Sequence, residues 1–151
     1  MVEAYVIIGA MNTHKSATIR ALTGVRDQQT TWNVRWTDSS KDMTTYVEPR
    51  SLQEKGIDAA AFAKFVGASG SKRVIFALRP EGKHSGGKYY EGAEHYLEQL
   101  RKKGWRIKGL IELSGPYNIS STFTVSSNID DSINIAGNEI AHLIKPYWPI
   151  L

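Results

Sequence analysis

The sequence has no cysteine among its 151 residues. This excludes a disulfide-stapled scaffold, thiolate metal sites and a cysteine nucleophile, and it fits a reducing cytoplasm. Long apolar runs are also missing, and the N-terminal stretch 5–8 lacks the basic flank and cleavage signature of a leader. We therefore expect a cytoplasmic protein that has no membrane partner.

Glycine and proline are few, with 13 and 5 residues, which disfavours fibrous and disordered architectures. Hydrophobic residues make up 41% of the chain and charged residues 23%, as in ordinary globular proteins. A chain of this length buries roughly 70% of its unfolded surface on folding. We expect a single domain over residues 1–151, whose net charge of +4 mildly favours phosphate-bearing partners.

Two common catalytic signatures are missing from the sequence. No Gly-x-Ser-x-Gly segment indicates a hydrolase, and the four histidines have no spacing typical of a zinc site. The catalytic residues therefore stay unknown at this point. Four acidic residues are open as a general base until a structure places them: Asp38, Asp42, Glu48 and Glu112.

Strand and helix signals alternate along the chain. Apolar or alternating runs predict strands at residues 4–8, 32–36, 43–47, 74–78, 107–113 and 122–125. Helical spacing predicts helices over 15–22, 59–66 and 91–103, and a last helix carrying Ile129, Ile133, Ile140 and Ile144 that ends before Pro146.

The arrangement of these elements predicts an α/β fold. The short polar turn 37–42 indicates one antiparallel hairpin, and strands separated by helices favour a mainly parallel sheet of about six strands. Helices on both sides of the sheet would make three layers, α/β/α. A ligand site is then expected at the carboxyl ends of the parallel strands.

The first predicted strand runs directly into Gly9-Ala10-Met11-Asn12-Thr13-His14-Lys15-Ser16. This segment matches G-x-x-x-x-G-K-[ST] except at His14, which stands in place of glycine. Backbone N–H groups of such a loop form an anion cradle, and the positive end of the next helix adds to its field. Lys15 would reach the terminal phosphates and Ser16 would bind Mg²⁺. The predicted nucleotide-binding residues are Gly9, Asn12, Thr13, His14, Lys15, Ser16 and Ala17.

With this segment the chain resembles the P-loop NTPases, and the resemblance implies a P-loop NTPase-like fold. His14 leaves two outcomes open: its side chain blocks the cradle, or it adopts the positive φ that histidine tolerates and adds a phosphate donor. A third interpretation is an ordinary turn from strand to helix. In that case Lys15 is a solvated cation and Ser16 only a capping hydroxyl.

The order of elements resembles the small Ras-like GTPase domain over most of the chain. That resemblance implies that Mg²⁺ is bound by a threonine before the second strand, where Thr30 and Thr31 stand, and by Glu48. Together with Ser16 of the loop, the predicted metal ligands are Ser16, Thr31 and Glu48. The segment Glu48-Pro49-Arg50-Ser51 lacks the glycine of D-x-x-G, and the residues after position 113 differ from N-K-x-D. Neither a nucleotide switch nor guanine specificity is therefore carried over.

Two basic segments complete the set of candidates. Arg79, Lys83 and Lys88 surround a glycine-rich loop that would close over phosphates as a lid, with a solvated loop as the alternative. The cluster at 101–108 surrounds Trp105, which is compatible with a nucleic-acid patch and also with a charged helix end.

The leading hypothesis is a protein that binds ATP or GTP with Mg²⁺ and hydrolyses it slowly or not at all. The first alternative is a non-enzymatic interaction module that has lost nucleotide binding and acts through a protein partner. The second is a small phosphotransferase whose acceptor the sequence does not identify.

Overall fold

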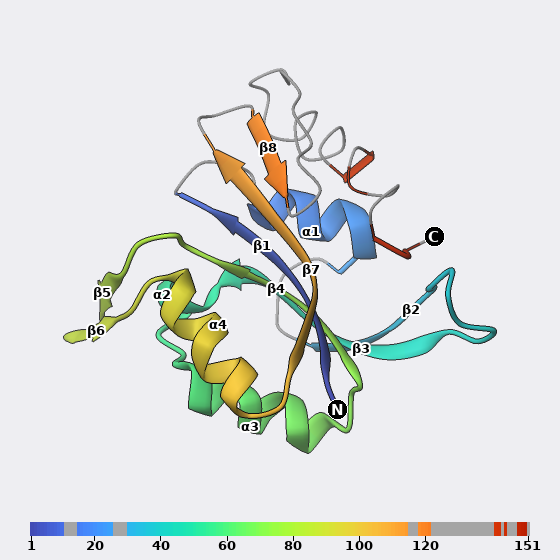
Figure 1. Cartoon of the computed structure of the whole chain (residues 1–151), viewed down its shortest axis with the longest axis horizontal. Helices are drawn as coiled ribbons and strands as arrows, with labels where there is room; N and C mark the ends of the chain where they lie inside the picture. Colours follow the sequence, from blue (N-terminus) through green and yellow to red (C-terminus); the bar gives the residue numbers. More distant parts are fainter. Residues whose placement is uncertain are drawn as a thin grey trace.

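The computed structural model describes residues 1–10, 15–25, 30–114, 118–121, 141–142, 144 and 148–150. Its centre is a six-stranded sheet in the order β2-β3-β4-β1-β7-β8, next to a small separate hairpin, β5-β6 (Figure 1). The strands are β1 (Glu3–Gly9), β2 (Thr30–Val34), β3 (Met43–Ser51), β4 (Arg73–Leu78), β5 (Lys83–Ser85), β6 (Lys88–Tyr90), β7 (Arg106–Ser114) and β8 (Asn118–Ser121). The helices are α1 (Lys15–Thr23), α2 (Leu52–Lys55), α3 (Ala59–Ser69) and α4 (Ala93–Lys102).

Most of the individual elements predicted from hydrophobic periodicity are confirmed. β1, β4, β7, α1, α3 and α4 lie where the sequence predicts them, and β2 and β3 form the predicted antiparallel hairpin. The predicted strand 122–125 lies outside the described residues. The same holds for Ile129, Ile133 and Ile140 of the predicted last helix, of which the structure describes helical residues only at 141–142 and 144.

The predicted fold class, a three-layer P-loop NTPase-like α/β/α fold with one antiparallel hairpin, is wrong. In the described residues, β2 and β8 both run antiparallel to their neighbours, so the sheet has an antiparallel strand at each edge. The hairpin β5-β6 adds a further antiparallel pair. The helices also cover the two faces unequally: α3 and α4 lie on one side, and α1 is the main described helix on the other (Figure 1). The chain is a mixed α/β protein.

The direction of β8 follows from the length of its connection. β7 ends at Ser114 and β8 begins at Asn118, so only three residues join them. A parallel neighbour requires a crossover of about a dozen residues or more, whereas an antiparallel neighbour requires only a tight turn. The chain therefore has to return antiparallel beside β7.

The hairpin β5-β6 replaces the loop predicted around the glycines. Its turn is formed by Gly86 and Gly87, whose φ angles of 59° and 79° are both positive. A two-residue turn with positive φ at both positions matches the right-handed twist of a hairpin, and two glycines adopt it without steric cost.

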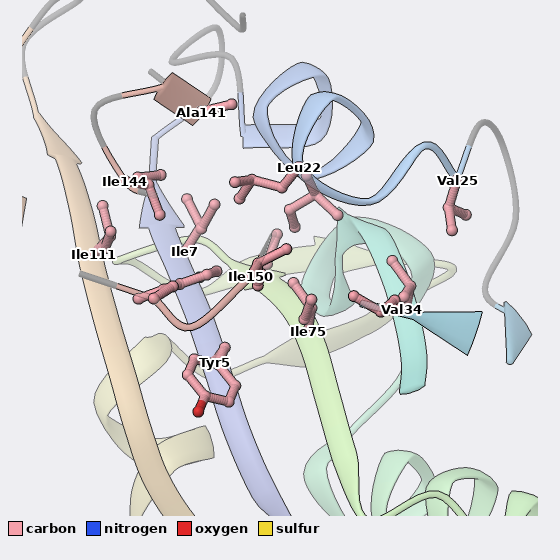
Figure 2. Close-up of a cluster of buried hydrophobic side chains, with 14 of the residues drawn as sticks. Tyr5, Ile7, Leu22, Val25, Val34, Ile75, Ile111, Ala141, Ile144 and Ile150 are labelled. Atoms are coloured by element: carbon pink, nitrogen blue, oxygen red, sulfur yellow. The ribbon is translucent and has the colours of Figure 1, made fainter. Parts of the chain in front are cut away.

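Side chains alternate strictly between the two faces of the central strands. Tyr5 and Ile7 of β1, like Ile75 of β4, belong to the cluster beneath α1 and the C-terminal segment (Figure 2). Val6 of β1 and Phe76 of β4 belong to the cluster that α3 and α4 cover. Both faces of these strands are buried, which explains why their sequences are continuously apolar.

Pairing in the sheet decides where a ligand can bind. β4 and β7 run parallel to β1 on either side of it, and β3 runs parallel to β4. The carboxyl ends of these four strands therefore meet at one edge, which we call the carboxyl edge. Gly9, Ser51, Leu78 and Ser114 are the last residues of these strands.

Candidate anion site

Lys15 is the first residue of α1 and lies at the carboxyl edge, shortly after β1. Its side chain is only 6% exposed, and its Nζ donates a hydrogen bond to the carbonyl of Ala10 at 2.9 Å. The solvated-cation interpretation of Lys15 is therefore wrong. The predicted ligands Asn12, Thr13 and His14 lie outside the described residues. Whether the His14 side chain blocks the anion cradle or donates to phosphate therefore stays a prediction.

The environment of Lys15 disfavours its charged form. Burial lowers the pKa of Lys15 below its ordinary value, and the nearby charge of Arg79 lowers it further, while Glu54 acts in the opposite direction. Burying the Lys15 ammonium group reduces the free energy of unfolding, because a charged group loses hydration when it is buried.

Arg79 is the second cation of the site and directly follows β4. Its side chain is 18% exposed, and Glu54 Oε1 lies 3.9 Å from its Nη1. Within the described part of the chain, neither Nε nor Nη1 of Arg79 has a hydrogen-bond partner, although both atoms are buried. Lys15 and Arg79 thus bring two largely buried cations to the carboxyl edge from two different strands.

The backbone of Arg79 is held by Gln53 of α2. The Gln53 side chain is fully buried, accepts a hydrogen bond from the Arg79 N–H at 3.0 Å and donates one to the Arg79 carbonyl at 3.0 Å. A further hydrogen bond from the same Nε2 reaches the carbonyl of Glu91 at 3.2 Å. Gln53 therefore fixes the end of β4 from which the Arg79 side chain starts.

Ser16 has a hydrogen-bond partner other than a metal. Its hydroxyl donates to the carbonyl of Pro49 at 2.7 Å, which ties the start of α1 to the end of β3. Gly9 is the last residue of β1, and Ala17 lies with Lys15 in the first turn of α1.

Glu48 is fully buried, and its carboxylate already has an ion-pair partner. Its Oε1 accepts the N–H of Arg50 at 3.0 Å, and its Oε2 lies 3.3 Å from Nζ of Lys55. Alternation along β3 places Glu48 on the same face as Tyr46, which packs in the α3 and α4 cluster and not beneath α1.

The three predicted metal ligands are not brought together as a site. Ser16 belongs to α1, Glu48 faces the opposite side of the sheet, and Thr31 lines a separate surface hollow with Trp32, Asn33 and Thr44. Among the described residues, no group of three or more acidic or histidine side chains is arranged to hold a metal ion. A Mg²⁺ ion that is bound together with nucleotide phosphates needs no such group, so magnesium binding itself stays a prediction.

The predicted lid residues have separate surroundings. Lys88 lies on the β5-β6 hairpin, 3.5 Å from the carboxylate of Asp58, which caps the N-terminus of α3. Lys83 is partly exposed on the opposing strand, and only Arg79 lies at the cationic site. Lys88 thus has an exposed ion-pair partner on α3 and does not lie at the cationic site.

A larger hollow of about 1210 Å³ lies nearby but has the opposite charge character. Ile8 and Leu110 contribute apolar lining, and the carboxylates around it are Glu81, Glu91, Glu94, Glu98 and Glu112. The five carboxylates outnumber the one arginine of the lining, Arg101, and disfavour phosphate, so this hollow is not the proposed anion site. Of the four acids considered as a general base, Glu112 lines this hollow, whereas Asp38 and Asp42 pair with Arg73 and Arg35.

The basic cluster at 101–108 does not offer its tryptophan to nucleic-acid bases. Trp105 is 8% exposed and packs against Phe62 and Phe76, at ring-centroid distances of 5.9 Å and 6.3 Å. Base stacking needs an accessible ring face, so the exposed part of this segment consists of charged side chains alone.

Sequence reasoning missed α2 and with it Gln53 and Glu54. The signal was present, because Ser51-x-x-Glu54 is a capping-box pattern and Gly56 stands where a C-terminal glycine is expected. In the structure Ser51 Oγ accepts the N–H of Glu54, and Gly56 has a φ of 68°. A helix of four residues is too short to show a hydrophobic period, which is why periodicity did not reveal it.

No match was found when the chain was compared with protein-family models, curated proteins and solved structures. Within the described part of the chain, no helix has the length and apolar character needed to span a membrane.

Proposed function

We propose that this chain binds the phosphate groups of a nucleoside triphosphate at the carboxyl edge and hydrolyses it slowly or not at all. The observation that carries the proposal is the buried Lys15 near a largely buried Arg79, whose Nε and Nη1 are buried donors that the described residues leave unpaired. Buried cations normally have an anionic or hydrogen-bonding partner. A phosphate supplies both charge and several acceptor oxygens.

The position of Lys15 in the chain supports the same ligand. It begins a nine-residue helix, and the N-terminus of a helix carries partial positive charge and unpaired N–H groups. Anions bind at such ends, and the lysine adds a full positive charge there. The segment from Gly9 to Ser16 also matches a phosphate-binding pattern at all specified positions except His14.

The surroundings of Glu48 support slow or absent turnover. A general base has to reach the nucleophile, and Glu48 is fully buried in an ion pair with Lys55 on the other face of the sheet. Mg²⁺ needs no cluster of protein carboxylates for this role, because a nucleotide-bound ion is held largely by phosphate oxygens and water.

Thermal unfolding tests the proposal directly. ATP, GTP, their diphosphates and pyrophosphate are each added with and without Mg²⁺, and Tm is measured. A ligand at about 100 times its Kd stabilises the folded state by about 2.7 kcal/mol, which for a domain of this size raises Tm by roughly 5 to 10 °C. We expect such a shift with a triphosphate.

Two lysine variants identify the site. Lys15→Ala should abolish the shift, whereas Lys64→Ala, which removes the same charge from an exposed position on α3, should retain it. If no phosphate compound raises Tm of the native protein, or if Lys15→Ala binds with unchanged affinity, the proposal is wrong. The interaction-module hypothesis predicts the first of these results.

A further inference from the structure

Among the described residues of the carboxyl edge, the Arg79 guanidinium is the group with unpaired buried donors. Its Nε and Nη1 are buried atoms without a hydrogen-bond acceptor in the described part of the chain. Leaving a buried donor unpaired is costly, and more so for a charged group, so native structures rarely do it without a functional reason. The backbone from which this side chain extends is held in place, because Gln53 pairs with both the N–H and the carbonyl of Arg79.

The nearest carboxylate to Arg79 that the structure records is Glu54, the next residue after Gln53. Its Oε1 lies 3.9 Å from Nη1 of Arg79, which is within ion-pair range but too long for a hydrogen bond. The backbone of Glu54 belongs to a short helix, α2, that is capped at both ends by Ser51 and Gly56. The carboxylate therefore compensates the charge of Arg79 without satisfying its donors.

Glu54 acts on Lys15 as well. Its negative charge raises the pKa of Lys15, opposing the effects of burial and of Arg79. The two cations and this one carboxylate thus form a single electrostatic unit at the carboxyl edge. An anion that enters the unit gains from both cations but is repelled by Glu54.

From these contacts we propose that Glu54 is an internal competitor for the ligand, and that Arg79 exchanges it for a phosphate group. This inference rests on the proposed function and adds a regulatory device to the same site. The phosphate oxygens take the donors Nε and Nη1 that Glu54 does not reach, because the guanidinium group offers several N–H donors in a fixed plane. Glu54 neutralises the site while it is empty and weakens phosphate binding.

The experiment compares charge-neutral variants by isothermal titration calorimetry with pyrophosphate and with ATP. Glu54→Gln keeps the size of the side chain and removes its charge, and we expect Kd to fall about five- to tenfold, the effect of one unit charge a few ångströms away in a partly solvated site. Glu98→Gln is the matched control. It removes the same charge from an exposed pair with Lys102 on α4, and Kd should change less than about twofold.

A double-mutant cycle identifies Arg79 as the group over which ligand and carboxylate compete. Arg79→Gln alone should weaken binding at least about tenfold, and in that background Glu54→Gln should lose most of its benefit. Circular dichroism of each variant confirms that it is folded. Glu54→Asp, which shortens the side chain by one methylene, should tighten binding in the same direction but less than Glu54→Gln.

The outcomes separate this inference from the proposed function. If the native protein binds and Lys15→Ala does not, but Glu54→Gln binds equally well or more weakly, the competitor role is refuted and the function stands. If the native protein does not bind while Glu54→Gln does, the competitor role is supported. If neither protein binds pyrophosphate or ATP, both proposals are wrong.

Discussion

Arg73 donates two parallel hydrogen bonds to the carboxylate of Asp38, from Nη1 to Oδ1 at 2.7 Å and from Nη2 to Oδ2 at 2.6 Å. The Arg73 side chain is 7% exposed, lies over the Trp36 ring and also contacts Glu3. This pair joins the turn after β2 to the start of β4, at the edge of the sheet opposite the anion site. Asp38→Asn should lower the free energy of unfolding by about 1 to 2 kcal/mol at pH 7, because a charged acceptor is lost at a half-exposed position.

The same pair should make stability depend on pH in the acid range. The hydrogen bonds from Arg73 lower the pKa of Asp38 below its ordinary value. Its stabilising contribution is therefore complete above the unfolded-state pKa of about 3.9 and is lost as the pH falls through the lower folded-state value. Urea titrations of both proteins between pH 7 and pH 2 should show the difference vanish at the acid end. Asp42→Asn is the control, since its pair with Arg35 is exposed at 3.5 Å, and it should change stability by less than about 0.5 kcal/mol.

Two glycine substitutions should have opposite effects on stability. A Cβ at Gly109 would collide with the Trp148 indole nitrogen and would lie 2.7 Å from Cδ1 of Tyr5, both in the cluster beneath α1. Gly109→Ala should therefore destabilise the protein by about 1 to 3 kcal/mol. A Cβ at Gly67 meets nothing within 4 Å and lies in α3, so Gly67→Ala should stabilise by about 0.5 to 1 kcal/mol. Thermal unfolding of the two variants measures both changes. A Gly109→Ala protein with the Tm of the native protein would contradict the packing at this position.

Phe62 should be a major contributor to the core that α3 and α4 cover. It is fully buried, and its ring centroid lies 4.9 Å from that of Phe76, 5.7 Å from that of Tyr46 and 5.9 Å from that of Trp105. Phe62→Ala should cost about 3 to 5 kcal/mol in unfolding free energy. Phe65 on the same helix is 43% exposed, and Phe65→Ala should cost less than about 1 kcal/mol. Chemical denaturation of the two variants measures the contrast, and equal losses would contradict the exposed position of Phe65 in the structure.

Lys15 should reduce the stability of the empty protein. Lys15→Met keeps a long side chain but removes a buried charge, so we expect it to raise the unfolding free energy by about 1 kcal/mol or more at pH 7 while it abolishes phosphate binding. Because the folded-state pKa of Lys15 is lowered, the unfolded chain binds more protons between that pKa and the ordinary value of 10.5. The native protein should therefore gain stability relative to Lys15→Met as the pH rises into this range. Denaturation at pH 7 and pH 9 tests the trend, and a destabilised Lys15→Met protein at pH 7 would indicate a structural lysine.

The amino-acid sequence by itself determined most of the regular elements, because their hydrophobic patterns are local. The continuous apolar runs of β1 and β4 and the spacing in α3 specify strands and a helix without reference to the rest of the chain. The same local pattern placed Lys15 after the first strand, at the start of the first helix. The sequence also contains two local signals that hydrophobic periodicity does not detect. The capping pattern at Ser51 indicates α2, and the glycine pair at 86–87 indicates the turn of the β5-β6 hairpin.

Only the tertiary structure decided which of these residues meet. Lys15, Glu54 and Arg79 follow three different strands, and they come together because β1, β3 and β4 run parallel and end at one edge. In this sheet Glu48 lies on the face opposite α1. The three-residue connection after β7 makes β8 pair antiparallel with it at the edge of the sheet. Pairing between distant strands depends on long-range contacts and connection lengths, which the local pattern of a strand does not encode.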